Sequence, residues 1–243
     1  MSDTSLVPRL NWIVTTPSPI VRLKLLKLLK ELEFHSPLQR HFFPQYLFNF
    51  TPAQLCFLCH CIDETKNVAG MIAEVGCAAG ATTLFLNKHL DAEGIEKQYY
   101  TVDTFSGFVA EDINLEVSQR GKKRNYFTHD FQVNKKKWFD ETMRRHHFER
   151  VTSIEADVND FNLKSLGSLS FVLLDVDLYR PMSKCLRELY EILNVGGIMV
   201  VDDCSSEDVR WDGANQAYKE FIKEINQPEH IVHGKLGIVR KVR

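Results

Sequence analysis

The sequence predicts an α/β protein in which helices cover both faces of a mostly parallel sheet, with an antiparallel hairpin at one edge. Three observations lead to this fold class. Strand-like and helix-like stretches alternate from residue 68 onward, which is typical of a parallel sheet. Two apolar runs, at 169–175 and 197–202, end abruptly in carboxylates, as buried strands do at a sheet edge. Gly234-Lys235 separates the last two strand-like runs, which suits a hairpin.

Length and composition are those of one globular domain. The chain has 243 residues, and its 30 basic and 32 acidic residues leave a formal net charge of −2. This balance gives no reason to expect nucleic acid as a partner. No stretch approaches the roughly 20 apolar residues of a membrane span, so no stable membrane insertion is expected. Residues 1–11 lack a signal-peptide pattern, so the six cysteines indicate reduced thiols and a cytoplasmic location.

The N-terminal part precedes the alternating pattern. Residues 20–33 form an amphipathic, leucine-rich helix pattern, residues 41–50 are rich in aromatic side chains, and residues 52–65 look helical. We expect residues 1–66 to form a helical segment that acts as a lid or as an oligomerisation surface. A homo-oligomer is therefore possible, and residues 67–243 form the ligand-binding domain.

The alternating part is predicted to contain seven strands and four helices. The strands are expected at 68–76, 98–103, 151–156, 169–175, 197–202, 229–233 and 236–241. The helices are expected at 81–90, 131–146, 181–193 and 213–226. The piece from 105 to 130 is rich in charge and turn residues, and we expect it to be a loop that closes over the site.

The first strand leads into a turn of small residues. Glu74 ends the strand and could bind the amino group of a ligand, and Gly76 and Gly80 would let a ligand approach the backbone. Thr82 or Thr83 could cap the following helix.

The second strand ends in an acid, Asp103, which lies 29 residues after Glu74. An acid at this place commonly accepts hydrogen bonds from ribose hydroxyls. The turn lacks the third glycine of the dinucleotide fingerprint, which argues against NAD. The two features together favour the binding of a nucleoside.

Four more acids follow two neighbouring strands. Asp175 and Asp177 come after one strand, and Asp202 and Asp203 come after the next. Parallel strands would bring all four to the carboxyl edge of the sheet, where open α/β folds bind ligands. Four carboxylates repel one another unless a cation lies among them, most simply a hard divalent ion such as Mg²⁺. The alternative, ordinary helix caps and solvated strand ends, leaves that repulsion uncompensated.

Four motifs together carry a family resemblance: Glu-Val-Gly-x-x-x-Gly, Val-Asp-Thr-Phe-x-Gly, Leu-Asp-x-Asp-Leu-Tyr and Gly-Gly-x-x-Val-Val-Asp-Asp. In this order and spacing they resemble the class I S-adenosylmethionine-dependent methyltransferases. More narrowly, they resemble the macrocin O-methyltransferase family, which methylates hydroxyls on sugars of natural products. The resemblance implies a Rossmann-like sheet of seven strands, the seventh antiparallel, and a magnesium site.

The resemblance also assigns roles to residues. Asp175, Asp202 and Asp203 match the metal ligands of the family, and Asp177 matches its proposed general base. The expected cofactor-binding residues are Glu74, Gly76, Ala78, Gly80, Thr82, Asp103, Thr104, Ala156 and Asp157, of which Ala156 and Asp157 fall where the family contacts adenine.

The chemistry of methyl transfer is consistent with these roles. A sugar hydroxyl is about as weak an acid as water, and a bound metal lowers its pKa while a carboxylate accepts its proton. Asp175 and Asp177 are two residues apart, so in an ideal strand both face one side. The bend that begins at Leu178 could then separate a metal ligand from the base.

The sequence thus predicts a Mg²⁺-dependent O-methyltransferase that uses S-adenosylmethionine. Its acceptor would be a sugar or another polyhydroxylated small molecule of natural-product biosynthesis. One alternative is methylation of catechols or other phenols, with Phe42, Phe43, Tyr46 and Phe48 forming a slot for a flat ring. The other alternative is a cofactor-binding protein of the same fold without catalysis.

Overall fold

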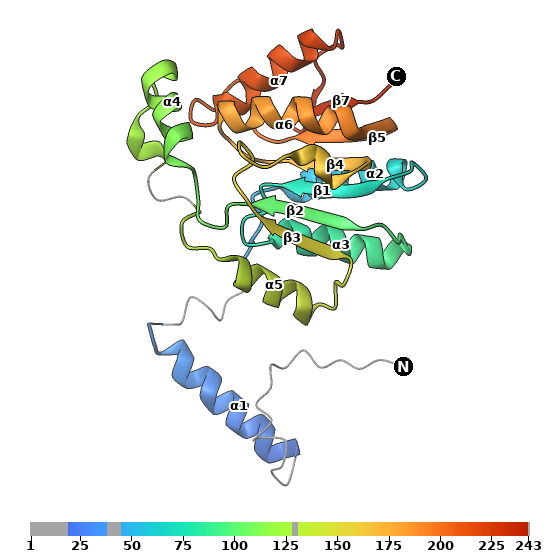
Figure 1. The fold of residues 1–243 in the computed structure, drawn as a ribbon. Helices are drawn as coiled ribbons and strands as arrows, with labels where there is room; N and C mark the ends of the chain where they lie inside the picture. The colour runs from blue at the N-terminus through green and yellow to red at the C-terminus, as the bar shows by residue number, and fades with distance from the viewer. Residues whose placement is uncertain (1–18, 38–44, 128–130, 243) are drawn as a thin grey trace. The chain divides into compact units, whose positions relative to one another are not determined.

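The chain divides into two units, Met1–Leu47 and Phe48–Arg243. The computed structural model describes residues 19–37, 45–127 and 131–242 (Figure 1). In the first unit, helix α1 (Pro19–Phe34) exposes apolar side chains such as Leu23, Leu28 and Leu32. All further elements belong to the second unit.

The second unit is built on one sheet of seven strands in the order β3-β2-β1-β4-β5-β7-β6. The strands are β1 (Met71–Val75), β2 (Tyr99–Asp103), β3 (Val151–Glu155), β4 (Leu169–Leu174), β5 (Leu193–Val201), β6 (Ile231–Val232) and β7 (Leu236–Arg240). The first five are parallel, whereas β7 runs antiparallel to β5 and β6 antiparallel to β7. The predicted fold class, including the antiparallel edge hairpin, is confirmed.

Helices cover both faces of this sheet (Figure 1). On one face, α6 (Tyr179–Ile192) and α7 (Asp212–Glu224) pack on a core that includes Val172 and Leu174 of β4. On the other face, α2 (Pro52–Thr65) and α3 (Ala81–Glu93) pack on a core that includes Phe171 and Leu173. Successive side chains of β4 point to opposite faces and all six are buried, which explains its uninterrupted apolar sequence.

Local signals position α2 against the sheet. Thr51 and Gln54 form a reciprocal capping box, and Pro52 occupies the first turn, where its missing N–H costs nothing. Leu55, Leu58 and Ile62 then face the core. Helix α2 falls within the expected N-terminal segment 1–66 and belongs to the second unit, Phe48–Arg243.

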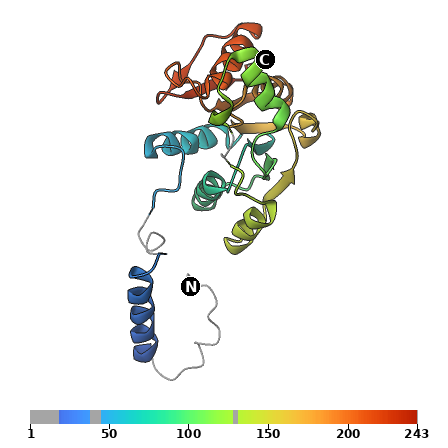
Figure 2. The ribbon, with the colours of Figure 1, turned by 90° about the vertical axis from the view of Figure 1, so that its left-hand side faces the viewer.

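Three further differences concern single elements. The expected loop at 105–130 contains helix α4 (Ala110–Arg120), which lies beyond the carboxyl ends of the strands and contacts α6 (Figures 1 and 2). Helix α5 (Lys136–Arg145) is shorter than the predicted 131–146. Strand β5 begins at Leu193 and not at the predicted 197, so Gly196 and Gly197 both lie inside the strand.

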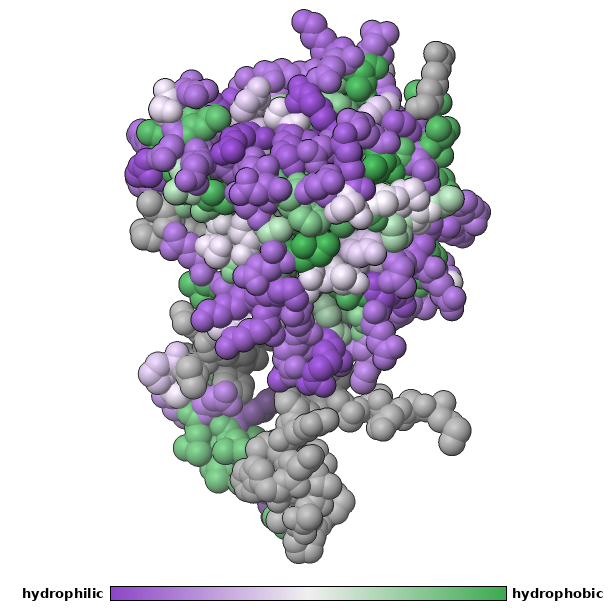
Figure 3. Space-filling model, in the orientation of Figure 1, coloured by the Kyte–Doolittle hydropathy of each residue, from purple (hydrophilic) through white to green (hydrophobic). Residues whose placement is uncertain are grey.

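The face of the second unit seen in Figure 3 is mostly hydrophilic. Within the described ranges, no helix combines the length and the apolar character that crossing a membrane requires.

Candidate functional site

The turn after β1 has a buried acid beneath it. Glu74 is 1% exposed, and its Oε2 accepts hydrogen bonds from Thr83 Oγ1 at 2.6 Å and Tyr99 Oη at 2.7 Å. Burial raises the pKa of Glu74 to about 7, although the two hydroxyl donors oppose this shift. The Thr83 hydroxyl therefore donates its hydrogen bond to Glu74 and does not cap α3. The N-cap residue of α3 is Gly80, and no side chain forms a capping hydrogen bond there. The expected threonine cap is wrong.

The two glycines of this turn have left-handed backbone, with φ of +88° at Gly76 and +86° at Gly80. A Cβ on Gly76 would lie 1.7 Å from the carbonyl oxygen of Asp175, and one on Gly80 would lie 2.7 Å from the Phe139 ring. Both positions therefore require glycine, because protein atoms occupy the space of a side chain. The contact at Gly76 joins the predicted cofactor turn to the first of the four acids.

Asp103 lies at the end of β2 beside the same turn. Its Oδ2 accepts a hydrogen bond from the Ala78 N–H at 2.8 Å and its Oδ1 one from the Phe105 N–H at 2.6 Å. Burial raises the pKa of Asp103, while these backbone donors lower it. Ala78 donates from a left-handed backbone, with φ of +44°. Each carboxylate oxygen has a second lone pair, so the geometry leaves capacity for the ribose hydroxyls expected here.

The predicted adenine contacts follow β3. The Ala156 N–H donates to the Asp103 carbonyl at 3.0 Å, so the two strand ends lie side by side. Asp157 Oδ1 accepts hydrogen bonds from the backbone and the side chain of Asn159 at 2.8 and 2.9 Å. The hydroxyl of Thr104 donates to the Gly107 carbonyl at 2.7 Å, and Thr82 is half-buried in the first turn of α3. The cofactor roles of these residues stay predictions.

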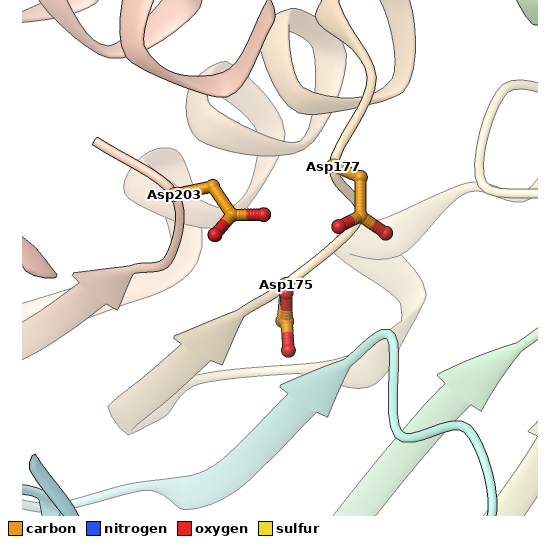
Figure 4. A group of neighbouring side chains, drawn as sticks. All are labelled: Asp175, Asp177 and Asp203. Carbon is orange, nitrogen blue, oxygen red and sulfur yellow. The ribbon is translucent and has the colours of Figure 1, made fainter. Parts of the chain in front are cut away.

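The structure brings three of the four acids together (Figure 4). One carboxylate oxygen from each of Asp175, Asp177 and Asp203 lies within 4.8 Å of the others. The Asp175 N–H donates to Val75 O at 2.8 Å, which continues the pairing of β4 with β1 by one residue and holds this acid at the sheet edge. Asp177 and Asp203 have left-handed backbone, with φ of +58° and +56°, so the two-residue strand period does not set the direction of Asp177.

Burial and mutual repulsion act together on this acidic group. Burial and the neighbouring carboxylates raise the pKa of Asp175 and of Asp177 well above the ordinary aspartate value. For Asp175 the strongest neighbour is Asp202, and for Asp177 it is Asp203.

Asp202 has a different partner, which sequence reasoning missed. Its side chain is buried, and its Oδ2 lies 2.6 Å from the Lys235 ammonium, which also lies 3.4 Å from Asp203 Oδ1. Burial and repulsion from Asp203 raise the pKa of Asp202 to about 6, although Lys235 opposes the shift. Burial alone would lower the pKa of Lys235, but Asp202 and Asp203 raise it above its ordinary value. In the sequence, Gly234-Lys235 predicts only a hairpin turn.

The donor set fits a hard divalent cation. Asp175, Asp177 and Asp203 offer carboxylate oxygens close enough to share one ion, and oxygen is the ligand atom that Mg²⁺ prefers. Asp202 Oδ1 is buried without a hydrogen-bond partner among the described residues. Its lone pairs are therefore open to an ion or to water.

The structure describes two of the four aromatic residues considered for a catechol slot. Phe48 packs edge-on against Phe85 of α3, with ring centroids 5.6 Å apart. Tyr46 is exposed and belongs to the first unit. Phe42 and Phe43 lie outside the described residues.

The family model described as Macrocin-O-methyltransferase (TylF) matches residues 53–233, which is most of the chain. A comparison with curated protein sequences gives no match.

Solved structures show the same fold at low sequence identity. The crystal structure of CalS11, a calicheamicin methyltransferase, is 20% identical with a TM-score of 0.66, and the alignment covers 98% of this chain and 99% of that one. An apo structure of CalS11, described as a TDP-rhamnose 3'-O-methyltransferase, is 18% identical with a TM-score of 0.57. The alignment covers 93% of this chain and 96% of that one. The O-methyltransferase NovP is 18% identical with a TM-score of 0.63, and the alignment covers 78% of this chain and 79% of that one.

Proposed function

The chain belongs to the macrocin O-methyltransferase family, and on that premise we propose that it methylates a hydroxyl of a sugar or another polyhydroxylated small molecule. We further propose that the reaction belongs to natural-product biosynthesis and depends on Mg²⁺. The observation that carries the proposal is the contact of Gly76 with Asp175, because it sets the predicted cofactor turn directly beside the acidic group. Methyl donor and acceptor must adjoin for an in-line transfer.

S-adenosylmethionine, the methyl donor of this enzyme class, supplies an electrophilic methyl group when it is bound. The turn from Glu74 to Thr82 would hold its methionine part, and Asp103 with Thr104 would accept its ribose hydroxyls. Ala156 and Asp157 would border the adenine. The adjacent ends of β2 and β3 support this arrangement.

The acids would handle the acceptor. We propose that Asp175, Asp202 and Asp203 hold the divalent cation and that Asp177 accepts the proton of the hydroxyl. A bound Mg²⁺ supplies the Lewis acidity that lowers the pKa of a weakly acidic hydroxyl. Asp177 suits the role of base because its carboxylate lies next to those of Asp175 and Asp203. Adjacent hydroxyls on the acceptor would favour chelation.

The name of one structural neighbour suggests the first acceptors to test. CalS11 is described as a TDP-rhamnose 3'-O-methyltransferase. We expect the present chain to transfer labelled methyl from S-adenosylmethionine to members of a panel of nucleoside-diphosphate sugars and glycosides. A chelator should abolish the transfer, and added Mg²⁺ should restore it.

Three outcomes would contradict parts of this proposal. Transfer to catechol alone would favour the phenol alternative, and transfer that is insensitive to chelator would exclude the cation. Binding of S-adenosylmethionine without turnover on any acceptor would favour a non-catalytic protein of this fold.

A further inference from the structure

One basic side chain enters the acidic group from the edge hairpin. Among the described residues, the ion pairs that reach the four acids come from Lys235, which contacts Asp202 at 2.6 Å and Asp203 at 3.4 Å. The Lys235 side chain is 23% exposed and that of Asp202 only 3%, so the pair is poorly screened by water.

The backbone fixes Lys235 in this place. It follows Gly234, whose φ of +82° makes the tight turn between β6 and β7. The Lys235 carbonyl accepts a hydrogen bond from the Cys204 N–H at 2.7 Å, which ties the hairpin to the residue after Asp203. The ammonium also lies 4.9 Å from the centroid of the Phe50 ring.

This arrangement divides the four acids into two kinds. The buried Asp202 has a resident cationic partner, whereas Asp175, Asp177 and Asp203 face one another and could share an external ion. Asp203 belongs to both sets, because it lies 3.4 Å from Lys235 and within the group of three. A divalent ion at this group would therefore approach a fixed positive charge.

We propose that Lys235 is a positioning residue that serves as an internal counter-ion of the acidic site. It holds Asp202 and Asp203 in place when no divalent cation is bound, and it weakens the binding of that cation so that the ion can exchange. The second part rests on the cation site of the proposed function, and the first part does not.

The test is a double-mutant cycle of Lys235→Met, Asp202→Asn and the double variant in the full chain. Each protein is unfolded thermally in chelator, and its affinity for Mn²⁺ is measured by calorimetry. In chelator we expect Lys235→Met to have a lower unfolding midpoint than the wild type, because Asp202 keeps a buried charge without a partner. Adding Asp202→Asn should recover part of that loss. The Mn²⁺ affinity of Lys235→Met should rise by about tenfold, because a nearby positive charge is removed.

Lys97→Met is the matched control. Lys97 Nζ donates hydrogen bonds to two backbone carbonyls, Val68 O at 2.6 Å and Gly70 O at 3.0 Å. Like Lys235 it is held by hydrogen bonds, but these two partners are carbonyls and not carboxylates. Its removal should leave Mn²⁺ affinity unchanged. Lys235→Arg, which keeps the charge, should retain the wild-type midpoint in chelator.

Different results overturn different claims. An unchanged midpoint of Lys235→Met in chelator, or additive effects in the cycle, would overturn the counter-ion role. Mn²⁺ affinity that stays the same or falls in Lys235→Met would overturn the effect on the cation. If the wild type binds no Mn²⁺, the proposed cation site is wrong, while a lowered midpoint of Lys235→Met would still support the counter-ion role.

Discussion

Two of the candidate catalytic acids have unusual backbone conformations. Asp177 and Asp203 have positive φ, which is uncommon outside glycine and costs free energy unless the surroundings impose it. Aspartate and asparagine tolerate this region better than most residues. With these conformations, one carboxylate oxygen of each lies within 4.8 Å of the other and of one of Asp175 (Figure 4).

Asp177→Asn is therefore a clean test of the base, since asparagine keeps the shape and the tolerance for positive φ but cannot accept the proton. We expect turnover to fall by roughly 10²- to 10⁴-fold, the usual contribution of a general base. Affinity for the product S-adenosylhomocysteine, measured by calorimetry, should stay nearly unchanged. The exposed Asp160→Asn is the control. Normal turnover of Asp177→Asn would remove Asp177 as the base.

Glu74 predicts an unusual dependence of stability on pH. Its pKa is raised to about 7 in the folded chain, because burial disfavours the charged carboxylate. The folded state then binds a proton that the unfolded state releases, so this contribution to stability is present below the ordinary pKa and is lost as pH rises through about 7. The loss attributable to Glu74 is at most about 3 kcal/mol.

Urea unfolding of Glu74→Gln at several pH values from about 4.5 to about 8 checks this expectation. The uncharged glutamine should remove the loss of stability that Glu74 causes as pH rises. The difference in unfolding free energy between variant and wild type should therefore change with pH. Glu96→Gln, at an exposed glutamate, should show no such change. A constant difference for Glu74→Gln would show that Glu74 does not titrate in this range.

At the scale of elements, α4 joins the two helices that follow the acids. Glu116 is buried, and its carboxylate accepts a hydrogen bond from the backbone N–H of Tyr179, the first residue of α6, at 2.8 Å. Arg120 donates to Glu116 at 2.8 Å and to Asp212, the first residue of α7, at 2.7 Å. A Cβ on Gly213 would lie 2.7 Å from the Tyr179 nitrogen, so the helix starts are closely packed.

Replacing Arg120 should loosen this junction. Arg120→Met leaves the buried Glu116 without its cationic partner, and we expect a loss of about 3 kcal/mol in the free energy of unfolding. Arg144→Met removes an exposed, solvent-screened pair with Glu141 on α5 and should leave the free energy of unfolding nearly unchanged. Denaturant unfolding measures both. Equal small losses would mean that Arg120 does not hold α4 to the helix starts.

At the scale of the whole molecule, the packed cores belong to the second unit. The buried residues of the four hydrophobic clusters lie between Phe50 and Val239 within the described ranges. We therefore expect residues 48–243 to fold cooperatively without residues 1–47, with a thermal midpoint close to that of the full chain.

The same truncation tests the proposed role of the N-terminal segment. If that segment is a lid, residues 48–243 should bind S-adenosylhomocysteine but methylate the acceptor more slowly. If it is an oligomerisation surface, light scattering should show a smaller assembly. A truncated chain with full activity and an unchanged state of assembly would exclude both roles. A truncated chain that fails to unfold cooperatively would contradict the conclusion that the second unit holds its own hydrophobic cores.

The sequence alone determined the strands and most of the helices, because buried strands such as β4 and capped helices such as α2 carry their signals locally. It missed α4, whose composition is rich in charge. The signals that could have found this helix are Glu111 and Asp112 in the first turn, Arg120 in the last turn and Gly121 at the end.

The sequence also placed the acids at one sheet edge, because parallel strands end together. Only the tertiary structure decided which acid pairs with Lys235 and which three acids form the group that could share an ion. Lys235 follows Asp203 by 32 residues, and it reaches Asp202 because β7 pairs with β5 and its hairpin returns to the same edge. Likewise, only the packing of Gly76 against Asp175 shows that the predicted cofactor turn adjoins the acids. Contacts of this kind join residues far apart in the chain, so no local pattern encodes them.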